Sequence, residues 1–139
     1  MNAQLEVIAS DIDAPEQELD IVQQLNRARK WIEDALEYSG ETHTFVDIVR
    51  GVLNGQMQFW NGDNGCAVTE INVYPHKKNL HVFLAGGDMQ QILDFEASAA
   101  AWGKAQGCTS MTIAGRVGWK KVLGKRGWDE KFVVLGREI

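Results

Sequence analysis

The sequence predicts a single domain of mixed helices and strands, α/β (α+β), over residues 1–139. Its sheet is expected to be twisted, mixed and mostly antiparallel, with helices flanking it. The length of 139 residues, with 45% hydrophobic and 24% charged residues, suits one globular domain. Hydrophobic periodicity alternates along the chain between helical and extended segments. One helical segment between two strands is long enough for a right-handed crossover, which would make those two strands parallel.

The first 55 residues predict a short strand and two helices. LEVIAS, at residues 5–10, is the expected strand. A long amphipathic helix follows, with Asp13 as a suitable N-cap, apolar residues at three-to-four spacing and a stop at Gly40. A second helix begins after Thr44, and Asp47 three residues later completes the pattern of a capping box.

Three extended runs predict an antiparallel meander in the middle of the chain. The runs are QMQFW, CAVTEINVY and LHVFLA, at residues 56–60, 66–74 and 80–85. NGDNG and PHKKN separate these runs, and both are rich in residues that favour turns. The chain is therefore expected to reverse its direction twice in this region.

The last third of the chain predicts helix, strand, helix and strand. A helix is expected from Asp88 to a stop at residues 106–108, and SMTIAG, at residues 110–115, follows as a strand. RVGWKKVLGKRGW is the next helix, and KFVVLGREI, at residues 131–139, is a last strand. The crossover joins LHVFLA to SMTIAG, so we expect the splay between these two strands to form the principal cleft.

Charge, cysteine content and hydropathy argue against several classes of protein. The net charge of −5 argues against a nucleic-acid binder, although residues 101–139 hold eight Lys and Arg against three Asp and Glu. Cys66 and Cys108 form no CxxC pair, and no other potential ligand lies at metal-binding spacing, so we expect neither a disulfide framework nor a metal site. Without an apolar run of membrane-spanning length or a signal peptide, we expect a soluble protein of the cytoplasm.

The order of these elements resembles the GNAT superfamily of acyl-CoA-dependent N-acyltransferases over nearly the whole chain. The strongest local match is the strand, helix and strand at the end of the chain, where Gly127 and Trp128 resemble the family's usual Gly-Phe pair. More narrowly, VTEI, FLAGGD and GRVGWKKVLGKRGW are similar to segments of the short GNAT-like proteins encoded by tailed phages and prophages. The resemblance implies a GNAT-like fold, and a location in the cytoplasm of a bacterial host or in the virion.

The resemblance also implies a site for acetyl-CoA. In working members a loop of the form Gln/Arg-x-x-Gly-x-Gly/Ala follows the fourth strand, and its backbone N–H groups bind the CoA pyrophosphate. Here only Gly86 and Gly87 precede Asp88, whose carboxylate would cap the helix and take the N–H groups that a phosphate needs. A capped turn is therefore favoured over a phosphate cradle. The candidate cofactor-binding residues are Phe83, Leu84, Ala85, Gly86, Gly87 and Arg116.

Catalysis in the family commonly uses a carboxylate as the general base and a tyrosine as the general acid. The position of the tyrosine falls on Leu123, which has no proton to donate. Glu70 is the candidate base, because a carboxylate within the apolar alternation of CAVTEINVY could face the cleft, where burial would raise its pKa. The alternative is that Glu70 faces solvent. His81 is a second basic group on a strand, and an isolated strand histidine is more often a hydrogen-bonded or surface residue.

Two functions are compatible with these features. The leading hypothesis is a GNAT-fold phage or prophage protein with a degenerate acetyl-CoA site. It would be non-catalytic or weakly active, and would bind a phage or host protein as an accessory or virion-associated factor. The alternative is an active acetyl-CoA-dependent N-acetyltransferase, with Glu70 as the base and an amine held near the cleft.

Overall fold

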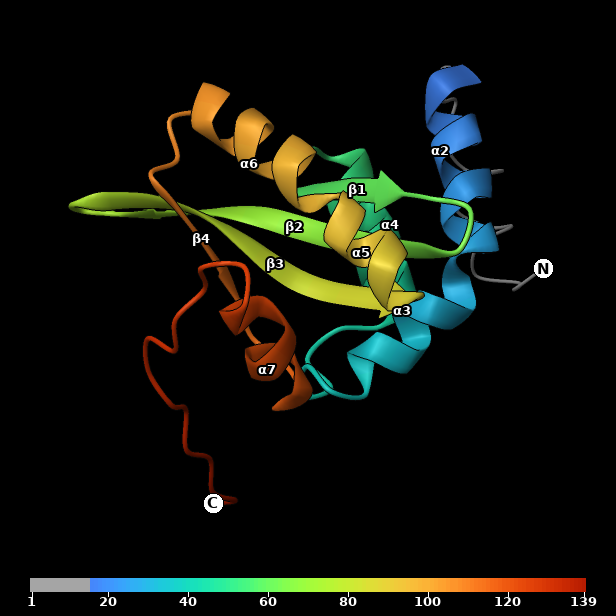
Figure 1. The fold of residues 1–139 in the computed structure, drawn as a ribbon. Coiled ribbons are helices and arrows are strands. Elements are labelled where there is room, and N and C mark those ends of the chain that lie inside the picture. The colour runs from blue at the N-terminus through green and yellow to red at the C-terminus, as the bar shows by residue number, and fades with distance from the viewer. Residues whose placement is uncertain (1–15) are drawn as a thin grey trace.

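A computed structural model describes residues 16–139 of the chain (Figure 1). The predicted strand at residues 5–10 and the predicted cap Asp13 lie outside the described residues. The elements, in chain order, are α2 (Glu16–Arg27), α3 (Arg29–Leu36), α4 (Phe45–Leu53), β1 (Met57–Asn61), β2 (Gly65–Tyr74), β3 (Lys77–Gly87), α5 (Met89–Asp94), α6 (Glu96–Ala105), β4 (Ser110–Ile113) and α7 (Gly118–Gly124).

The four described strands form one mixed sheet in the order β1-β2-β3-β4. β1 and β2 pair antiparallel, as do β2 and β3, whereas β3 and β4 pair parallel. The parallel pair is joined through α5 and α6, which is the predicted crossover connection. The predicted fold class, a mostly antiparallel mixed sheet with one β-α-β crossover, is confirmed.

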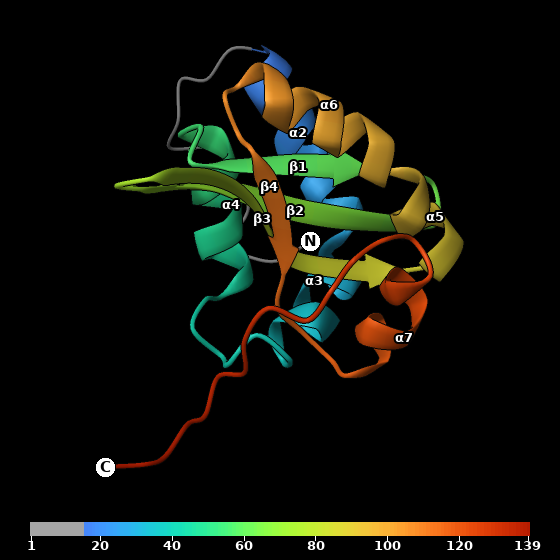
Figure 2. The same ribbon diagram turned by 60° about the vertical axis from the view of Figure 1, so that its left-hand side comes forward.

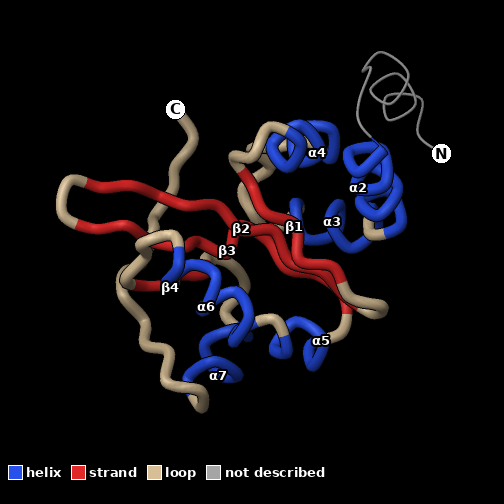
Figure 3. The backbone as a smooth tube through the Cα atoms, turned by 90° about the horizontal axis from the view of Figure 1, so that it is seen from above, coloured by secondary structure: helices blue, strands red, loops and turns tan. Residues whose placement is uncertain are grey.

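Helices cover both faces of the sheet (Figure 3). α2, α3 and α4 pack on one face, where Leu25, Ile32 and Ile48 are fully buried against strand residues such as Val68. α5, α6 and α7 pack on the other face, in two smaller clusters. The sheet is therefore the middle layer of three, and its two faces have separate cores.

The predicted long helix is two helices, α2 and α3, which meet at Ala28 (φ −87°, ψ 0°). Ala28 is only 1% exposed, so the change of direction occurs in the core, without a glycine or proline to mark it. The bend lets apolar residues from both helices, such as Val22 and Leu36, reach the same core. α3 ends at Leu36, before the predicted stop at Gly40.

The capping box predicted for α4 is confirmed. The backbone N–H of Asp47 donates to Thr44 Oγ1 at 3.3 Å, and the backbone N–H of Thr44 donates to Asp47 Oδ2 at 2.8 Å. Beyond the helix, Gly55 has a φ of 82°, a conformation that glycine adopts without steric cost. The fixed ends of α4 position Phe45, Ile48 and Val49 in the core.

Two predictions about the second half of the chain were wrong. The helix after Asp88 is divided at Phe95 into the short α5 and the longer α6. Residues 131–139 do not form a strand in the structure, and they extend away from the sheet (Figure 2). Their β-branched and aromatic side chains favour a strand, but a strand forms only where a neighbour accepts its backbone hydrogen bonds, and this segment lies beside none of the described strands.

Candidate functional site

The cleft predicted between β3 and β4 is present. The two strands pair from Asn79 with Ser110 as far as Val82 with Ile113, and there the pairing ends. β3 continues to Gly87, whereas the chain leaves β4 towards α7. From Phe83 onward, this edge of β3 therefore faces none of the described strands. Its backbone N–H and C=O groups are available to a ligand.

A β-bulge lies at the point where the strands separate. Val68 pairs with Leu84 and Thr69 pairs with Val82, which leaves Phe83 as an extra residue on β3. As a result, Phe83 and Leu84 both contact the core on the α2–α4 face. Val82 and Ala85, on either side of them, contact the core on the opposite face. The bulge turns the strand at the mouth of the cleft.

A small cavity occupies the cleft, and we call it the cleft cavity. Four of the predicted cofactor-binding residues line it together, namely Phe83, Leu84, Ala85 and Arg116. The Arg116 guanidinium lies over the ring of Tyr38, 4.5 Å from its centroid, and Tyr38 also lines the cavity. The cavity volume of about 20 Å³ is small and the cleft is partly open to solvent, so an acyl thioester would lie largely outside the cavity unless side chains moved.

Gly86 and Gly87 lie outside the cleft cavity, and the backbone packs closely at both. A Cβ on Gly86 would lie 2.5 Å from the carbonyl oxygen of Trp31 in α3. Gly87 has a φ of 98°, and a Cβ there would lie 2.5 Å from the carbonyl oxygen of Asn64. Packing and turn geometry therefore explain why both residues are glycines, and a phosphate-binding role is not needed to explain them.

Asp88 is the N-cap of α5, as the sequence predicts. Its Oδ2 accepts a hydrogen bond from the backbone N–H of Gln91 at 3.1 Å, and its own N–H donates to the carbonyl of Asn64 at 2.8 Å. A carboxylate therefore already uses an N–H group at the start of this helix and places a negative charge there.

Glu70 lies in a polar row that crosses three strands just below the cleft. Glu70 is half-buried and pairs with His81 across β2 and β3, and His81 lies opposite Thr112 on β4. The Nδ1 atom of His81 is 2.8 Å from Thr112 Oγ1, which also accepts a hydrogen bond of 2.7 Å from Asn79. The His81–Thr112 pair lies one residue pair before the point where β3 and β4 separate. Glu70 is not among the residues that line the cleft cavity.

Burial lowers the pKa of His81, and the nearby Glu70 carboxylate offsets part of this effect. The imidazole is therefore neutral at pH 7, the form that can accept a proton. His81 looks like an isolated strand histidine in the sequence, because its partner Thr112 lies thirty-one residues away. Only the parallel pairing of β3 and β4 reveals that contact.

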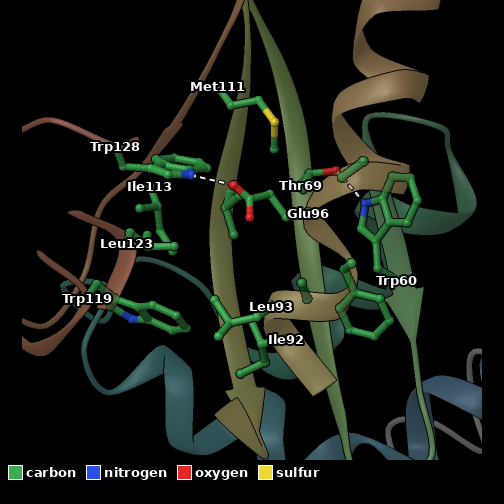
Figure 4. Close-up of a pocket in the computed structure, with 14 residues that line it drawn as sticks. Trp60, Thr69, Ile92, Leu93, Glu96, Met111, Ile113, Trp119, Leu123 and Trp128 are labelled. Atoms are coloured by element: carbon green, nitrogen blue, oxygen red, sulfur yellow. Dashed lines mark hydrogen bonds between the residues drawn. The ribbon is translucent and has the colours of Figure 1, made fainter. Parts of the chain in front are cut away.

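A second and larger cavity of about 50 Å³ lies on the opposite face of the sheet, and we call it the apolar cavity (Figure 4). α5, α6 and α7 enclose it with side chains such as Leu93 and Leu123. Trp119 and Ile113 line both cavities and so separate them. The pattern of aromatic and aliphatic residues on α7 predicts an apolar face, but not that Trp119 divides two cavities.

Glu96 is the only charged residue among those that line the apolar cavity. Its carboxylate accepts a hydrogen bond of 2.7 Å from the indole N–H of Trp128 (Figure 4) and another of 2.7 Å from Nε of Arg126. These two donors engage both oxygens, so the carboxylate is already neutralised and hydrogen-bonded.

Two other kinds of site are absent from the described part of the chain. Within residues 16–139, no three His, Cys, Asp or Glu residues gather in a way that could hold a metal ion. Among the helices of that same part of the chain, none is both long and apolar enough to cross a membrane.

Comparison with known proteins finds a structural similarity to an acetyltransferase. No family model and no curated protein matches the sequence. The crystal structure of an acetyltransferase from Trypanosoma brucei is similar, with a TM-score of 0.54 over 75% of this chain and 89% of that chain. The sequence identity is 11%, so the likeness concerns the fold alone. It confirms the acetyltransferase-like fold that the GNAT resemblance implies.

Proposed function

We propose that this chain is a GNAT-fold accessory protein that acts by binding another protein and has a degenerate acetyl-CoA site. The observation that carries the proposal is the position of Asp88. Its carboxylate accepts a hydrogen bond at the start of α5, which the resemblance makes the counterpart of the family's binding place for the CoA pyrophosphate. A pyrophosphate would have to displace that carboxylate and to overcome its charge.

Two further features support the proposal. Gly86 lies very close to the backbone of Trp31, and Gly87 lies very close to the backbone of Asn64. These glycines therefore serve the packing of the fold. The cleft cavity is small, and Leu123 is the residue that the resemblance places where the family has its proton-donating tyrosine. Cofactor binding and proton donation are both weakened, while the fold is retained.

The partner and origin that we propose come from the resemblance to short GNAT-like proteins of tailed phages and prophages. VTEI and FLAGGD support a phage or prophage gene whose product binds a phage or host protein, in the host cytoplasm or in the virion. Peptide mass spectrometry of purified particles from a strain that carries the gene tests the virion location. Peptides from this chain in the cell lysate but never in the particles would contradict it.

Isothermal titration calorimetry with acetyl-CoA tests the degenerate site. We expect no binding by the natural chain in the low micromolar range. Asp88→Asn should keep most of the cap and remove the charge, so it should gain measurable affinity for acetyl-CoA or pyrophosphate. Asp94→Asn is the matched control, because Asp94 is the last residue of the same helix and lies on its surface. The proposal fails if the natural chain binds tightly, or if Asp88→Asn binds no better than Asp94→Asn.

The polar row of Glu70, His81 and Thr112 favours a second candidate function, N-acetyl transfer. A substrate amine would attack the thioester carbonyl, Glu70 or neutral His81 would accept the amine proton, and water would protonate the departing thiolate. Release of free thiol from acetyl-CoA with a broad panel of amines tests this reaction. Turnover that falls in both Glu70→Gln and His81→Asn would support it, and background rates with every amine would exclude it.

A further inference from the structure

Asn79 on β3 is a buried amide whose side chain connects two residues of the neighbouring strand. It is 4% exposed. Its Oδ1 accepts a hydrogen bond of 2.8 Å from the hydroxyl of Ser110, and its Nδ2 donates one of 2.7 Å to Oγ1 of Thr112, both on β4. Because the oxygen and the nitrogen of the amide each have a partner, the side chain has one preferred orientation. A buried polar group that is fixed in this way can control the groups that it contacts.

The chain of hydrogen bonds continues from Thr112 to His81. Oγ1 of Thr112 lies 2.8 Å from Nδ1 of His81. This oxygen already accepts a hydrogen bond from Asn79, so its own proton can be donated to Nδ1. Every bond then runs in one direction, from Ser110 through Asn79 and Thr112 to His81. In this arrangement Nδ1 carries no proton, and the neutral ring keeps its proton on Nε2.

The Glu70 carboxylate favours this direction over the reverse. Glu70 lies opposite His81 on β2, on the flank of β3 away from Thr112. Burial lowers the pKa of His81 and the charge of Glu70 opposes this effect, which places the carboxylate near the ring. A proton on Nε2 offers that carboxylate a hydrogen-bond donor. In the reverse chain the amide of Asn79 is turned over and Nδ1 donates to Thr112, so the ring offers the carboxylate a lone pair instead.

We propose that Asn79 is a positioning residue that, through Thr112, holds His81 in its Nε2–H tautomer, so that His81 donates a hydrogen bond to Glu70 and Glu70 alone accepts the proton of an amine substrate. The chemistry rests on the second candidate function, N-acetyl transfer, whereas the tautomer is a property of the folded chain. As the amine attacks the thioester carbonyl, its N–H bond breaks and the proton passes to a carboxylate oxygen of Glu70. The departing thiolate takes a proton from water, and Glu70 then gives its proton to the hydroxide that remains.

Heteronuclear NMR of the full chain with isotope-labelled histidine tests the tautomer, at a pH where the ring is neutral. Protonated and unprotonated ring nitrogens resonate at well-separated shifts, and the His81 signals are identified by their loss in His81→Gln. We expect Nε2 of His81 to be protonated and Nδ1 to be unprotonated. His76 is the internal control, because it is exposed in the turn between β2 and β3 and should exchange between both tautomers. A proton on Nδ1 of His81 would overturn the proposal.

Two variants test the positioning role of Asn79. In Asn79→Asp the new carboxylate has no proton to donate, so Thr112 should turn its hydroxyl towards it and accept a bond from Nδ1, which moves the ring proton to Nδ1. Thr112→Val keeps the shape of the side chain but removes the link, so the share of the Nδ1–H form should rise, and this test stands if the buried carboxylate prevents Asn79→Asp from folding. Thr109→Val is the matched control at an exposed position just before β4 and should change nothing. A share of Nδ1–H in Thr112→Val equal to that in the natural chain would contradict the role of the link.

Release of thiol from acetyl-CoA with an accepted amine separates the roles of Glu70 and His81. Glu70→Gln removes the proton acceptor, so turnover should fall about a hundredfold or more. His81→Gln keeps an N–H donor near the position of Nε2, so turnover should fall only about tenfold or less. Equal losses in the two variants would make His81 the base and overturn the assignment.

The two parts of the proposal can fail separately. Background rates with every amine would exclude N-acetyl transfer, and with it the assignment of Glu70, whichever tautomer is found. An Nδ1–H tautomer would overturn the role of Asn79 even where transfer occurs.

Discussion

Trp128 and Glu96 are joined by a hydrogen bond of 2.7 Å between the indole N–H and Oε1, which links the segment after α7 to the start of α6. Arg126 donates a second bond, also of 2.7 Å, to the other carboxylate oxygen. The Glu96 side chain is 24% exposed, so water competes only in part for these bonds. One carboxylate therefore holds two segments that are thirty-two residues apart in sequence.

Glu96→Ala should lower the free energy of unfolding by about 1.5 to 3 kcal/mol, because it leaves the Trp128 and Arg126 donors without their acceptor. Urea unfolding at neutral pH measures this loss. Glu33→Ala is the control, because the Glu33 side chain is 50% exposed in a surface pair with Arg29. That pair should contribute about 0.5 kcal/mol or less. Equal losses in the two variants would contradict the role of Glu96.

The contribution of Glu96 should also depend on pH. Burial raises the pKa of Glu96, but hydrogen bonds from Trp128 and Arg126 and the charge of Arg126 lower it by more, so the net pKa lies below its usual 4.5. A lowered folded-state pKa adds stability above the unfolded-state pKa, and that stability is lost as the pH falls through the folded-state value. The stability difference between the natural chain and Glu96→Gln should therefore shrink in acid.

Thr44→Ala should destabilise the protein by about 1 kcal/mol, because the hydroxyl that caps α4 is lost. Thr44 also lowers the pKa of Asp47 through hydrogen bonds from its backbone N–H and its hydroxyl, and the alanine variant keeps only the first of these. Thermal unfolding followed by circular dichroism measures the effect. Ser98→Ala, at an exposed position within α6, should change stability little.

Gly86→Ala should be strongly destabilising, at about 2 kcal/mol or more, because its Cβ would overlap the backbone of Trp31 and α3 would have to move. Gly118→Ala is the opposite case. Gly118 begins α7 and has open space where the alanine Cβ would lie, so this change should be neutral or should stabilise by up to about 1 kcal/mol. A tolerated Gly86→Ala would mean that the approach to Trp31 is looser than the structure has it.

His81 should give the protein a second pH dependence, nearer to neutrality. Burial lowers its folded-state pKa below the usual 6.5, so the unfolded chain binds the proton first as the pH falls. Stability is then complete above the unfolded-state pKa and declines as the pH drops towards the folded-state value. Unfolding free energies between about pH 7 and about pH 5.5 should show this slope in the natural chain and a flatter one in His81→Gln.

Local sequence signals predicted much of this fold. Thr44 and Asp47 stand at capping-box spacing, and the turns between the three extended runs mark the meander without reference to any distant residue. The breaks at Ala28 and Phe95 have no such signal, because they arise where helices adjust to the core they cover. The segment of residues 132–135 shows the converse. Its composition favours a strand, but strand formation depends on a neighbour that composition does not supply.

The candidate site was less predictable than the fold, because its geometry comes from pairing between distant segments. The sequence indicated Phe83, Leu84, Ala85 and Arg116 through a resemblance, and the structure brings these four together around the cleft cavity. The contact of Arg116 with Tyr38 joins segments that no local pattern connects. Asp88 is different, since its role as a cap depends only on its own residue type and the helix that follows it.

The extra residue at Phe83 shifts the alternation of side chains between the two faces of β3 by one residue. In the half of the strand before it, odd-numbered residues such as His81 face one side, and beyond it the even-numbered Leu84 and Gly86 take that side. An alignment with a strand that lacks the bulge therefore needs a one-residue gap here, or it assigns residues 84–87 to the wrong face. Deletion of Phe83 would remove the bulge and restore regular alternation, so Leu84 would still face the core of α2–α4 and Ala85 would still face the opposite core.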